Sequence, residues 1–168
     1  NQTLLETINI NKNNFKVILL SANKDYITLL GQAEKYNVKN LIIKDKRSYF
    51  KLKKKNKKNI NIFNSYDEFD LIFKKKIDYV MSSITGIDGL EPTLKIIKFT
   101  KKIAIANKES IICGWNLISK ELKKNNVEFI PVDSEHFSIW YGLLGKNKFE
   151  IEKIYITASG GPFYNTPL

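Results

Sequence analysis

Short apolar runs alternate along the chain with stretches in which apolar residues recur at helical spacing. The runs are rich in β-branched side chains and bounded by polar residues, which is typical of buried strands. Behind the first run, Tyr26, Leu29, Leu30, Ala33 and Tyr36 follow at the spacing of one helix face. The pattern predicts strands at residues 17–20, 40–43, 60–63, 78–81, 102–106, 127–132 and 154–157.

Two local motifs mark helix starts between these strands. Ser65-Tyr66-Asp67-Glu68 matches a capping box, and Glu91-Pro92 places a proline where the first turn of a helix accepts it. Apolar stripes predict helices over residues 66–73, 117–122 and 137–144. Strands that alternate with helices imply parallel pairing through right-handed crossovers. The chain is therefore predicted to be α/β, with a doubly wound, mostly parallel sheet.

Composition supports a folded, reduced protein. Hydrophobic residues make up 43% of the 168 residues and aromatic residues 12%, which suits one packed domain and part of another. No apolar run approaches the roughly 20 residues that a membrane-spanning helix needs, and residues 1–6 show no signal-peptide pattern. The single cysteine, Cys113, excludes an internal disulfide and a cysteine-based zinc site, and it suits a reducing compartment.

The formal charge of +11 is concentrated in part in the segment 51–58, which reads Lys-Leu-Lys-Lys-Lys-Asn-Lys-Lys. Such a segment is either an electrostatic footprint for nucleic acid or another anionic surface, or a solvated helix end or loop. We favour the second interpretation, because the segment lacks interleaved aromatic residues and arginines. A basic nucleic-acid-binding module remains the alternative. Loss of tight, salt-sensitive nucleic-acid binding on replacing these lysines by serine would favour it.

Polar residues collect where the predicted strands end. In doubly wound sheets, ligands bind beyond the carboxyl ends of the strands. Small, amide, hydroxyl or charged side chains follow five of the strands, although ordinary helix caps and turns use the same residue types. These segments are residues 21–25, 82–86, 107–110, 133–136 and 159–162.

Asp133 and Glu135 are the strongest candidates among these residues. Two carboxylates on either side of one serine repel each other unless a cation compensates, and Mg²⁺ or Mn²⁺ prefers such oxygen ligands. A capped helix start with two acids is the alternative. His136 is interpreted as a supporting or packing residue rather than a proton shuttle, and Lys108 as either a surface ion pair or a substrate contact.

Three motifs in register carry a family resemblance. Residues 106–110 (Ala-Asn-Lys-Glu-Ser), 131–136 (Pro-Val-Asp-Ser-Glu-His) and 159–163 (Ser-Gly-Gly-Pro-Phe), with Thr-Pro-Leu at 166–168, resemble the 1-deoxy-D-xylulose 5-phosphate reductoisomerases in both order and spacing. The resemblance implies a Rossmann-like NADPH-binding domain over residues 1–132, followed by the start of an α+β catalytic domain over 133–168. It implies NADPH- and divalent-metal-dependent conversion of 1-deoxy-D-xylulose 5-phosphate to 2-C-methyl-D-erythritol 4-phosphate in non-mevalonate isoprenoid biosynthesis.

The resemblance also assigns site residues. The metal (Mn²⁺, Mg²⁺ or Co²⁺) is expected on Asp133 and Glu135, and these two residues with Lys108 form the expected catalytic group. Substrate contacts are expected from Lys108, Ser134, Glu135 and Ser159. The expected cofactor-binding residues are Ala22, Asn23, Lys24, Asp25, Asn107 and Glu109. Lys24 supplies positive charge for the 2′-phosphate of NADPH, although the family more often has glycine at the position of Asn23.

Several further expectations follow from the resemblance. The family carries a first strand and then a glycine-rich phosphate turn ahead of the position of Asn1. Beyond the position of Leu168 it carries a lid, a third metal carboxylate and a helical domain. We therefore expect this chain to be one inactive piece of a longer homodimeric enzyme with a sugar-phosphate substrate and no nucleic-acid or membrane partner. Its many Lys and Asn residues are typical of an AT-rich genome, so we expect the plastid stroma of an apicomplexan, with a bacterial cytoplasm as the alternative. A plain NADP-dependent dehydrogenase is a further alternative, and replacing Asp133 by Asn would discriminate it.

Overall fold

The computed structural model describes residues 5–8, 14–56 and 59–156 and confirms the α/β prediction. The strands are β1 (Leu19–Ala22), β2 (Asn40–Ile43), β3 (Asn61–Phe63), β4 (Ile77–Ser82), β5 (Thr100–Ile105) and β6 (Glu128–Pro131). The α-helices are α2 (Tyr26–Lys35), α3 (Lys46–Lys55), α4 (Phe69–Ile72), α5 (Leu90–Ile97), α6 (Lys108–Asn125) and α7 (Ser134–Gly142). Short 3-10 helices are η1 (Tyr66–Glu68), η2 (Ile87–Gly89) and η3 (Lys148–Glu150).

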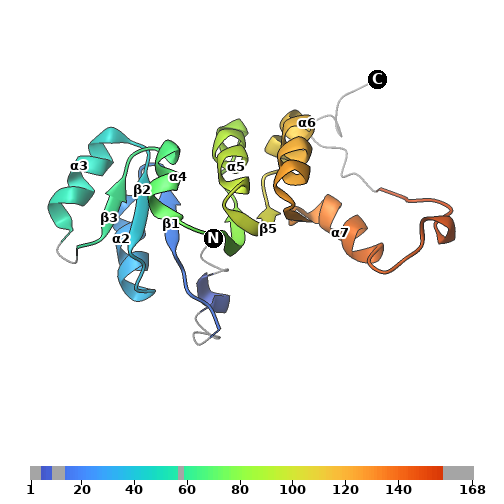
Figure 1. Ribbon diagram of the computed structural model, residues 1–168, viewed down its shortest axis with the longest axis horizontal. Helices are drawn as coiled ribbons and strands as arrows, with labels where there is room; N and C mark the ends of the chain where they lie inside the picture. The colour runs from blue at the N-terminus through green and yellow to red at the C-terminus, as the bar shows by residue number, and fades with distance from the viewer. Residues whose placement is uncertain (1–4, 9–13, 57–58, 157–168) are drawn as a thin grey trace, which may run out of the picture.

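All strand pairs in the described part of the chain are parallel, but they form two sheets. One has the order β1-β2-β3 and the other the order β4-β5-β6, each with three strands in the described ranges. The two groups lie beside each other along the long axis of the molecule (Figure 1). The predicted parallel pairing is confirmed, and no backbone ladder joins β1 to β4 among the described residues.

Apolar side chains on alternate faces of the strands build two cores. Leu41 and Ile43 of β2 pack with α2 and α3 in one cluster, whereas Ile42 between them belongs to the other. This second cluster runs across both sheets, since it also contains Ile103 and Ile105 of β5 and partly buried side chains of β1 and β4. Side-chain packing thus makes one layered body from two separate backbone ladders.

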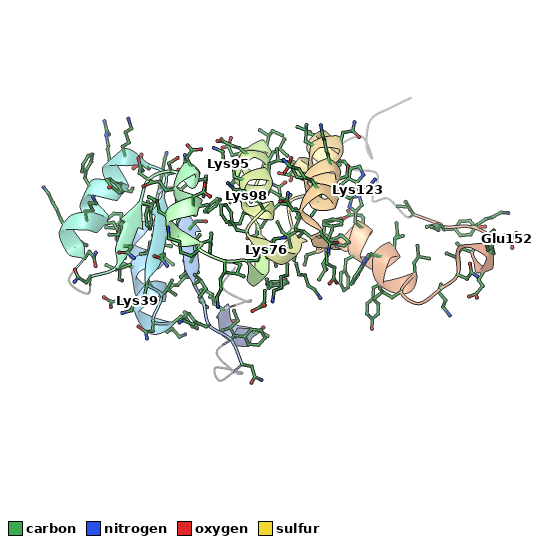
Figure 2. The ribbon with its side chains drawn as sticks, viewed as in Figure 1. Lys39, Lys76, Lys95, Lys98, Lys123 and Glu152 are labelled. Atoms are coloured by element: carbon green, nitrogen blue, oxygen red, sulfur yellow. The ribbon has the colours of Figure 1, made fainter. Side chains whose placement is uncertain are left out.

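Aromatic rings and ion pairs join η1 to α5, and join α4 to the two residues that follow α5. Phe69 lies in edge contact with Phe99, with ring centroids 6.0 Å apart. At the surface, Lys98 Nζ donates to Asp70 at 3.2 Å, and Lys95 Nζ donates to the carboxylate of Asp67 at 2.5 Å. Figure 2 shows Lys95 of α5 near Lys98, which directly follows the helix.

Several local predictions can be compared with the structure. The capping box at Ser65 is confirmed, with the side chain of Glu68 accepting from the Ser65 backbone N–H. The strand predicted at 154–157 was wrong where the structure describes it, because residues 154–156 form no ladder and their side chains are exposed. Leu144 lies beyond the end of α7. In the described ranges, no helix combines the length and the apolar character that crossing a bilayer requires.

Candidate functional site

A cavity of about 510 Å³ opens at the carboxyl edge of the strands, between the ends of β1 and β2 and the loop that follows β4. One wall is polar and contains Ser21, Asn23 and Lys44. The loop after β4, η2 and the start of α5 contribute the apolar side chains of Ile84, Ile87 and Pro92, together with the polar side chains of Thr85, Asp88 and Glu91. A planar apolar group that carries a charged substituent fits such a cavity, because each of its parts meets a wall of matching polarity.

Backbone hydrogen bonds fix the polar wall. The N–H of Lys44 donates to the carbonyl of Ala22 at 3.2 Å, and the N–H of Asp45 donates to the carbonyl of Asn23 at 2.9 Å. These bonds continue the parallel pairing of β1 with β2, in which Ala22 faces Ile43. The segment predicted to meet the 2′-phosphate is therefore held directly beside the residues that follow β2.

The four predicted residues of this segment have different surroundings. Ala22 and Asn23 line the cavity. Lys24 is exposed. The pKa of Asp45 is lowered mainly by hydrogen bonds from Ser48, and the nearby charge of Lys24 lowers it further. Asp25 caps α2, because its Oδ1 accepts from the N–H of Thr28 at 3.0 Å. Hydrogen bonds from Thr28 hold the pKa of Asp25 below its usual value.

Asn107, a predicted cofactor residue, ties the cavity loop to α6. Its side-chain amide donates to the carbonyls of Ile84 and, at 2.6 Å, of Gly86, and its Oδ1 accepts from the N–H of Ser110 at 3.0 Å. The residue is buried, so its side chain acts between protein segments. Glu109 is exposed on the first turn of α6. The structure therefore presents Glu109, and not the amide of Asn107, to solvent.

Asp133 caps α7 and keeps one carboxylate oxygen unused. Its Oδ1 accepts from the backbone N–H of His136 at 3.0 Å and lies 2.6 Å from the ring Nδ1 of the same residue. Since an ionised carboxylate only accepts, Nδ1 carries the proton. Oδ2 is buried and has no hydrogen-bond partner among the described residues. Burial raises the pKa of Asp133, but the hydrogen bonds and charge of His136 outweigh it and the pKa is lowered overall.

Glu135 lies beside Asp133, within the electrostatic influence of Lys108. The hydroxyl of Ser134 donates to Glu135 Oε2 at 2.7 Å. That bond, the backbone N–H of Glu135 and the positive charge of Lys108 hold the pKa of Glu135 below its usual value, against the opposing charge of Asp133. Lys108 starts α6, directly after Asn107. Asp133, Ser134 and Glu135 thus lie at the start of α7, with the charge of Lys108 close enough to act on Glu135, whereas Ser159 lies outside the described residues.

The donor set at Asp133 fits a hard divalent cation. A buried carboxylate oxygen without a partner is costly unless something compensates its charge, and Mg²⁺ needs only one or two protein carboxylates when substrate and water fill its remaining positions. In the part of the chain that the structure describes, no cluster of three or more His, Cys, Asp or Glu residues is placed to hold a metal. The described residues therefore offer two carboxylates to such an ion.

Sequence reasoning missed part of the cavity. Lys44 follows a correctly predicted strand, so the same inspection of strand ends could have found it. Tyr66 was assigned only to an apolar stripe, yet it lines the cavity and its hydroxyl bonds to Ser21. Asp88 and Glu91 also line the cavity, and nothing in their local sequence pattern separates them from surface acids.

Comparison with known families gives two matches that together span most of the chain. Residues 1–114 match the family described as 1-deoxy-D-xylulose 5-phosphate reductoisomerase. Residues 129–168 match the family described as the C-terminal domain of the same enzyme.

Curated relatives and solved structures agree with these matches. The chain is 56% identical to a 1-deoxy-D-xylulose 5-phosphate reductoisomerase of Pelagibacter ubique over 99% of its own length and 44% of the relative's. It is 41% identical to a reductoisomerase of Clostridium tetani, over 95% and 42% of the two lengths.

Two solved structures extend the comparison to three dimensions. The reductoisomerase of Zymomonas mobilis in complex with NADPH superposes with a TM-score of 0.84 at 32% identity, covering 97% of this chain and 43% of that one. A reductoisomerase structure described with fosmidomycin and magnesium gives a TM-score of 0.82 at 25% identity, covering 98% and 44%. The chain thus spans less than half the length of the relatives it matches.

Proposed function

Because this chain belongs to the 1-deoxy-D-xylulose 5-phosphate reductoisomerase family, we propose that the protein containing it catalyses the reaction of that family: NADPH- and divalent-metal-dependent rearrangement and reduction of 1-deoxy-D-xylulose 5-phosphate to 2-C-methyl-D-erythritol 4-phosphate. Two family matches covering residues 1–114 and 129–168 support the proposal. The observation that carries it is the buried, unpartnered Oδ2 of Asp133 beside Glu135 and Lys108.

The division into domains is part of this proposal. Residues 1–132 would form the NADPH-binding domain, and residues 133–168 would begin the catalytic domain. The position of Asp133 just after β6, the last described strand, supports a boundary there. β1 and β4 are edge strands of the two sheets, and in the described ranges they form no backbone hydrogen bonds with each other. A doubly wound sheet holds its first strand between such edges, and we infer that this is the place of the strand that the family carries ahead of its phosphate turn.

NADPH would lie along the carboxyl edge of the sheets. Ala22, Asn23, Lys24 and Asp25 would surround the adenosine end, where Lys24 supplies positive charge. Asn107 and Glu109 would lie toward the nicotinamide end, the former by holding the loop at Ile84 and Gly86 in place. The cofactor supplies hydride, and the protein supplies its position and the exclusion of water.

Asp133 and Glu135 would hold the divalent cation, which when bound polarises a substrate carbonyl and stabilises negative charge on its oxygen atoms. His136 keeps Oδ1 of Asp133 in place, so that Oδ2 is the oxygen available for binding. Lys108 and Ser134 would bind the substrate backbone, and Ser159 its phosphate. The lowered pKa of Glu135 keeps its carboxylate ionised at neutral pH, as a metal ligand must be.

Replacing Asp133 by Asn in the complete protein tests this function. We expect turnover of 1-deoxy-D-xylulose 5-phosphate with Mg²⁺ or Mn²⁺, followed as NADPH oxidation, to fall by about 10³-fold. NADPH affinity should be nearly unchanged, because Asp133 does not line the cavity. The matched control is Asp78→Asn, which removes the same charge at the start of β4 and should keep turnover within about twofold. A plain NADP-dependent dehydrogenase would barely respond to the Asp133 change, and that result would contradict the proposal.

Assembly and location are further parts of the proposal. The family resemblance supports a homodimer, which sedimentation of the complete protein would test. The relatives reported above are bacterial, and this favours the bacterial cytoplasm over the plastid stroma as the location. Identification of the genome that encodes the chain would decide between them.

A further inference from the structure

Lys44 is a cationic residue of the cavity with a role beyond the predicted cofactor contacts. It follows β2 and lines the cavity beside Asn23. Its Nζ lies 5.1 Å from the ring centroid of Tyr66 and makes no hydrogen bond or ion pair with the residues that the structure describes. We propose that Lys44 is a second anchor for the 2′-phosphate of NADPH and sets the preference for NADPH over NADH, an inference that rests on the proposed function.

The backbone places Lys44 at the phosphate end of the cavity. The N–H of Lys44 donates to the carbonyl of Ala22, and the next residue bonds to Asn23. Ala22 and Asn23 belong to the segment proposed to meet the 2′-phosphate. The Lys44 side chain therefore starts beside that segment and lines the same cavity. An ammonium there reaches a phosphate that Lys24 approaches from the neighbouring strand end.

Tyr66 holds the Lys44 side chain in this position. The Tyr66 ring is only 8% exposed and contacts Phe69, with centroids 5.7 Å apart, and Ser21 of β1 lies close enough to its hydroxyl to oppose the rise that burial causes in the pKa of Tyr66. A fixed ring attracts the ammonium through its quadrupole. Because this attraction already restricts the lysine, less conformational entropy is lost when the ammonium binds an anion.

The charges around this end of the cavity favour an anion. Lys24 and Arg47 both approach Asp45 closely enough to lower its pKa, after the larger contribution of the Ser48 hydrogen bonds. Asp45 Oδ1 is already used at the cap of α3, where it accepts from the Ser48 N–H at 2.8 Å. A dianionic phosphate beside Asn23 would therefore meet ammonium and guanidinium groups, opposed by the carboxylates of Asp25 and Asp45, each of which already caps a helix.

The acids of the cavity come from elements other than β1 and β2. Asp88 and Glu91 come from η2 and α5, and Glu91 is paired with Lys95. Asp67 also accepts a hydrogen bond from Lys95. Lys95 and Ser65 are the main causes of its lowered pKa, and the charge of Lys44 is a smaller one. Lys95 thus occupies the carboxylates of Asp67 and Glu91, which would otherwise compete for the Lys44 ammonium.

The test compares adenosine 2′,5′-bisphosphate with 5′-AMP, since the two probes differ only in the 2′-phosphate. For Lys44→Met in the complete protein, we expect the dissociation constant of the bisphosphate to rise about tenfold and that of 5′-AMP to change by less than about twofold. Lys44→Arg keeps the charge and should stay within about threefold of the wild type for both. NADPH and NADH should repeat the same contrast in calorimetric titrations.

Lys39→Met is the matched control. Lys39 is exposed at the opposite end of β2, labelled in Figure 2, and the variant removes the same charge away from the cavity. It should leave both dissociation constants within about twofold. Equal weakening of both probes by Lys44→Met, or no weakening of either, would overturn the inference. If the complete protein bound the bisphosphate in a Lys44-dependent way but did not turn over 1-deoxy-D-xylulose 5-phosphate, the proposed function would fail and the role of Lys44 would stand.

Discussion

Single side chains at the carboxyl edge serve two purposes at once. Asp133 was interpreted from sequence as either a helix cap or a metal ligand, and the structure confirms the cap. The cap uses Oδ1 and leaves Oδ2 buried without a described partner. The two interpretations are therefore compatible, because each uses a different oxygen of the same carboxylate.

Asn107 shows what sequence reasoning can and cannot reach at this scale. Its place at a strand end followed from the apolar pattern. Its partners did not, because Ile84 and Gly86 lie more than twenty positions earlier in the sequence and meet Asn107 only once β4 and β5 pair. The same limit applies to Tyr66, whose contact with Ser21 depends on how η1 packs against β1.

Replacing Asn107 by Asp should destabilise the protein strongly. The carboxylate keeps the acceptor for the Ser110 N–H but loses both donors and faces two carbonyl oxygens in a buried site. We expect the free energy of unfolding in urea to fall by about 2–4 kcal/mol. Asn116→Asp, on an exposed position of α6, introduces the same charge and should change it by less than about 0.5 kcal/mol. Similar losses in both variants would show that charge, and not the lost donors, is responsible.

At the scale of elements, helix starts are the features that the sequence predicts best. Asp25, Asp45, Asn107 and Asp133 each accept a backbone N–H at the start of a helix, and such Asx caps can be recognised from local sequence. The strand predicted at 154–157 failed for the opposite reason. A strand needs a partner, and an apolar run contains no information about which partner is present.

Gly89 is the element-scale position where packing leaves no room for a side chain. It ends η2, and an added Cβ would lie 2.6 Å from the carbonyl oxygen of Ile84 and closer still to the amide nitrogen of Asn107. Gly89→Ala should therefore displace the loop at the cavity and lower the free energy of unfolding by about 1–3 kcal/mol. NADPH binding should weaken with it, which titration of the variant would measure.

Gly31→Ala is the control for that change. Gly31 lies inside α2 with nothing within 4 Å of an added Cβ, so alanine should raise the free energy of unfolding by up to about 1 kcal/mol through its better helix propensity. Destabilisation by both alanines in the same urea experiment would argue against the steric explanation for Gly89.

At the scale of the molecule, the sequence predicted the layers but not the division of the sheet. Alternating strands and helices determine that pairing is parallel, and they predict helices on both faces. They do not determine which strand edges meet. The two sheets are held together by the core that contains Ile42 and Ile103 and by contacts of η1 and α4 with α5, all of which join residues distant in sequence.

Varying the pH separates the contribution of the surface ion pair at this junction to the stability of the fold from the contribution of the buried aromatic cluster. Hydrogen bonds from Lys95 and Ser65, with the charge of Lys95, lower the pKa of Asp67 below its unfolded value. A carboxylate with a depressed pKa stabilises the fold above its unfolded pKa, and this contribution is lost as the pH falls through the folded pKa. Lys95→Met should therefore lower the melting temperature at pH 7, by about 1–2 °C because the pair is exposed. It should have no effect once the pH falls below the lowered folded pKa of Asp67, where that carboxylate is protonated. Phe69→Ala, which empties part of the buried aromatic cluster, should cost about 3–5 kcal/mol at both pH values. If the melting temperature of Lys95→Met stayed below that of the wild type at low pH, the lysine would stabilise the junction through its packed aliphatic chain and not through its charge.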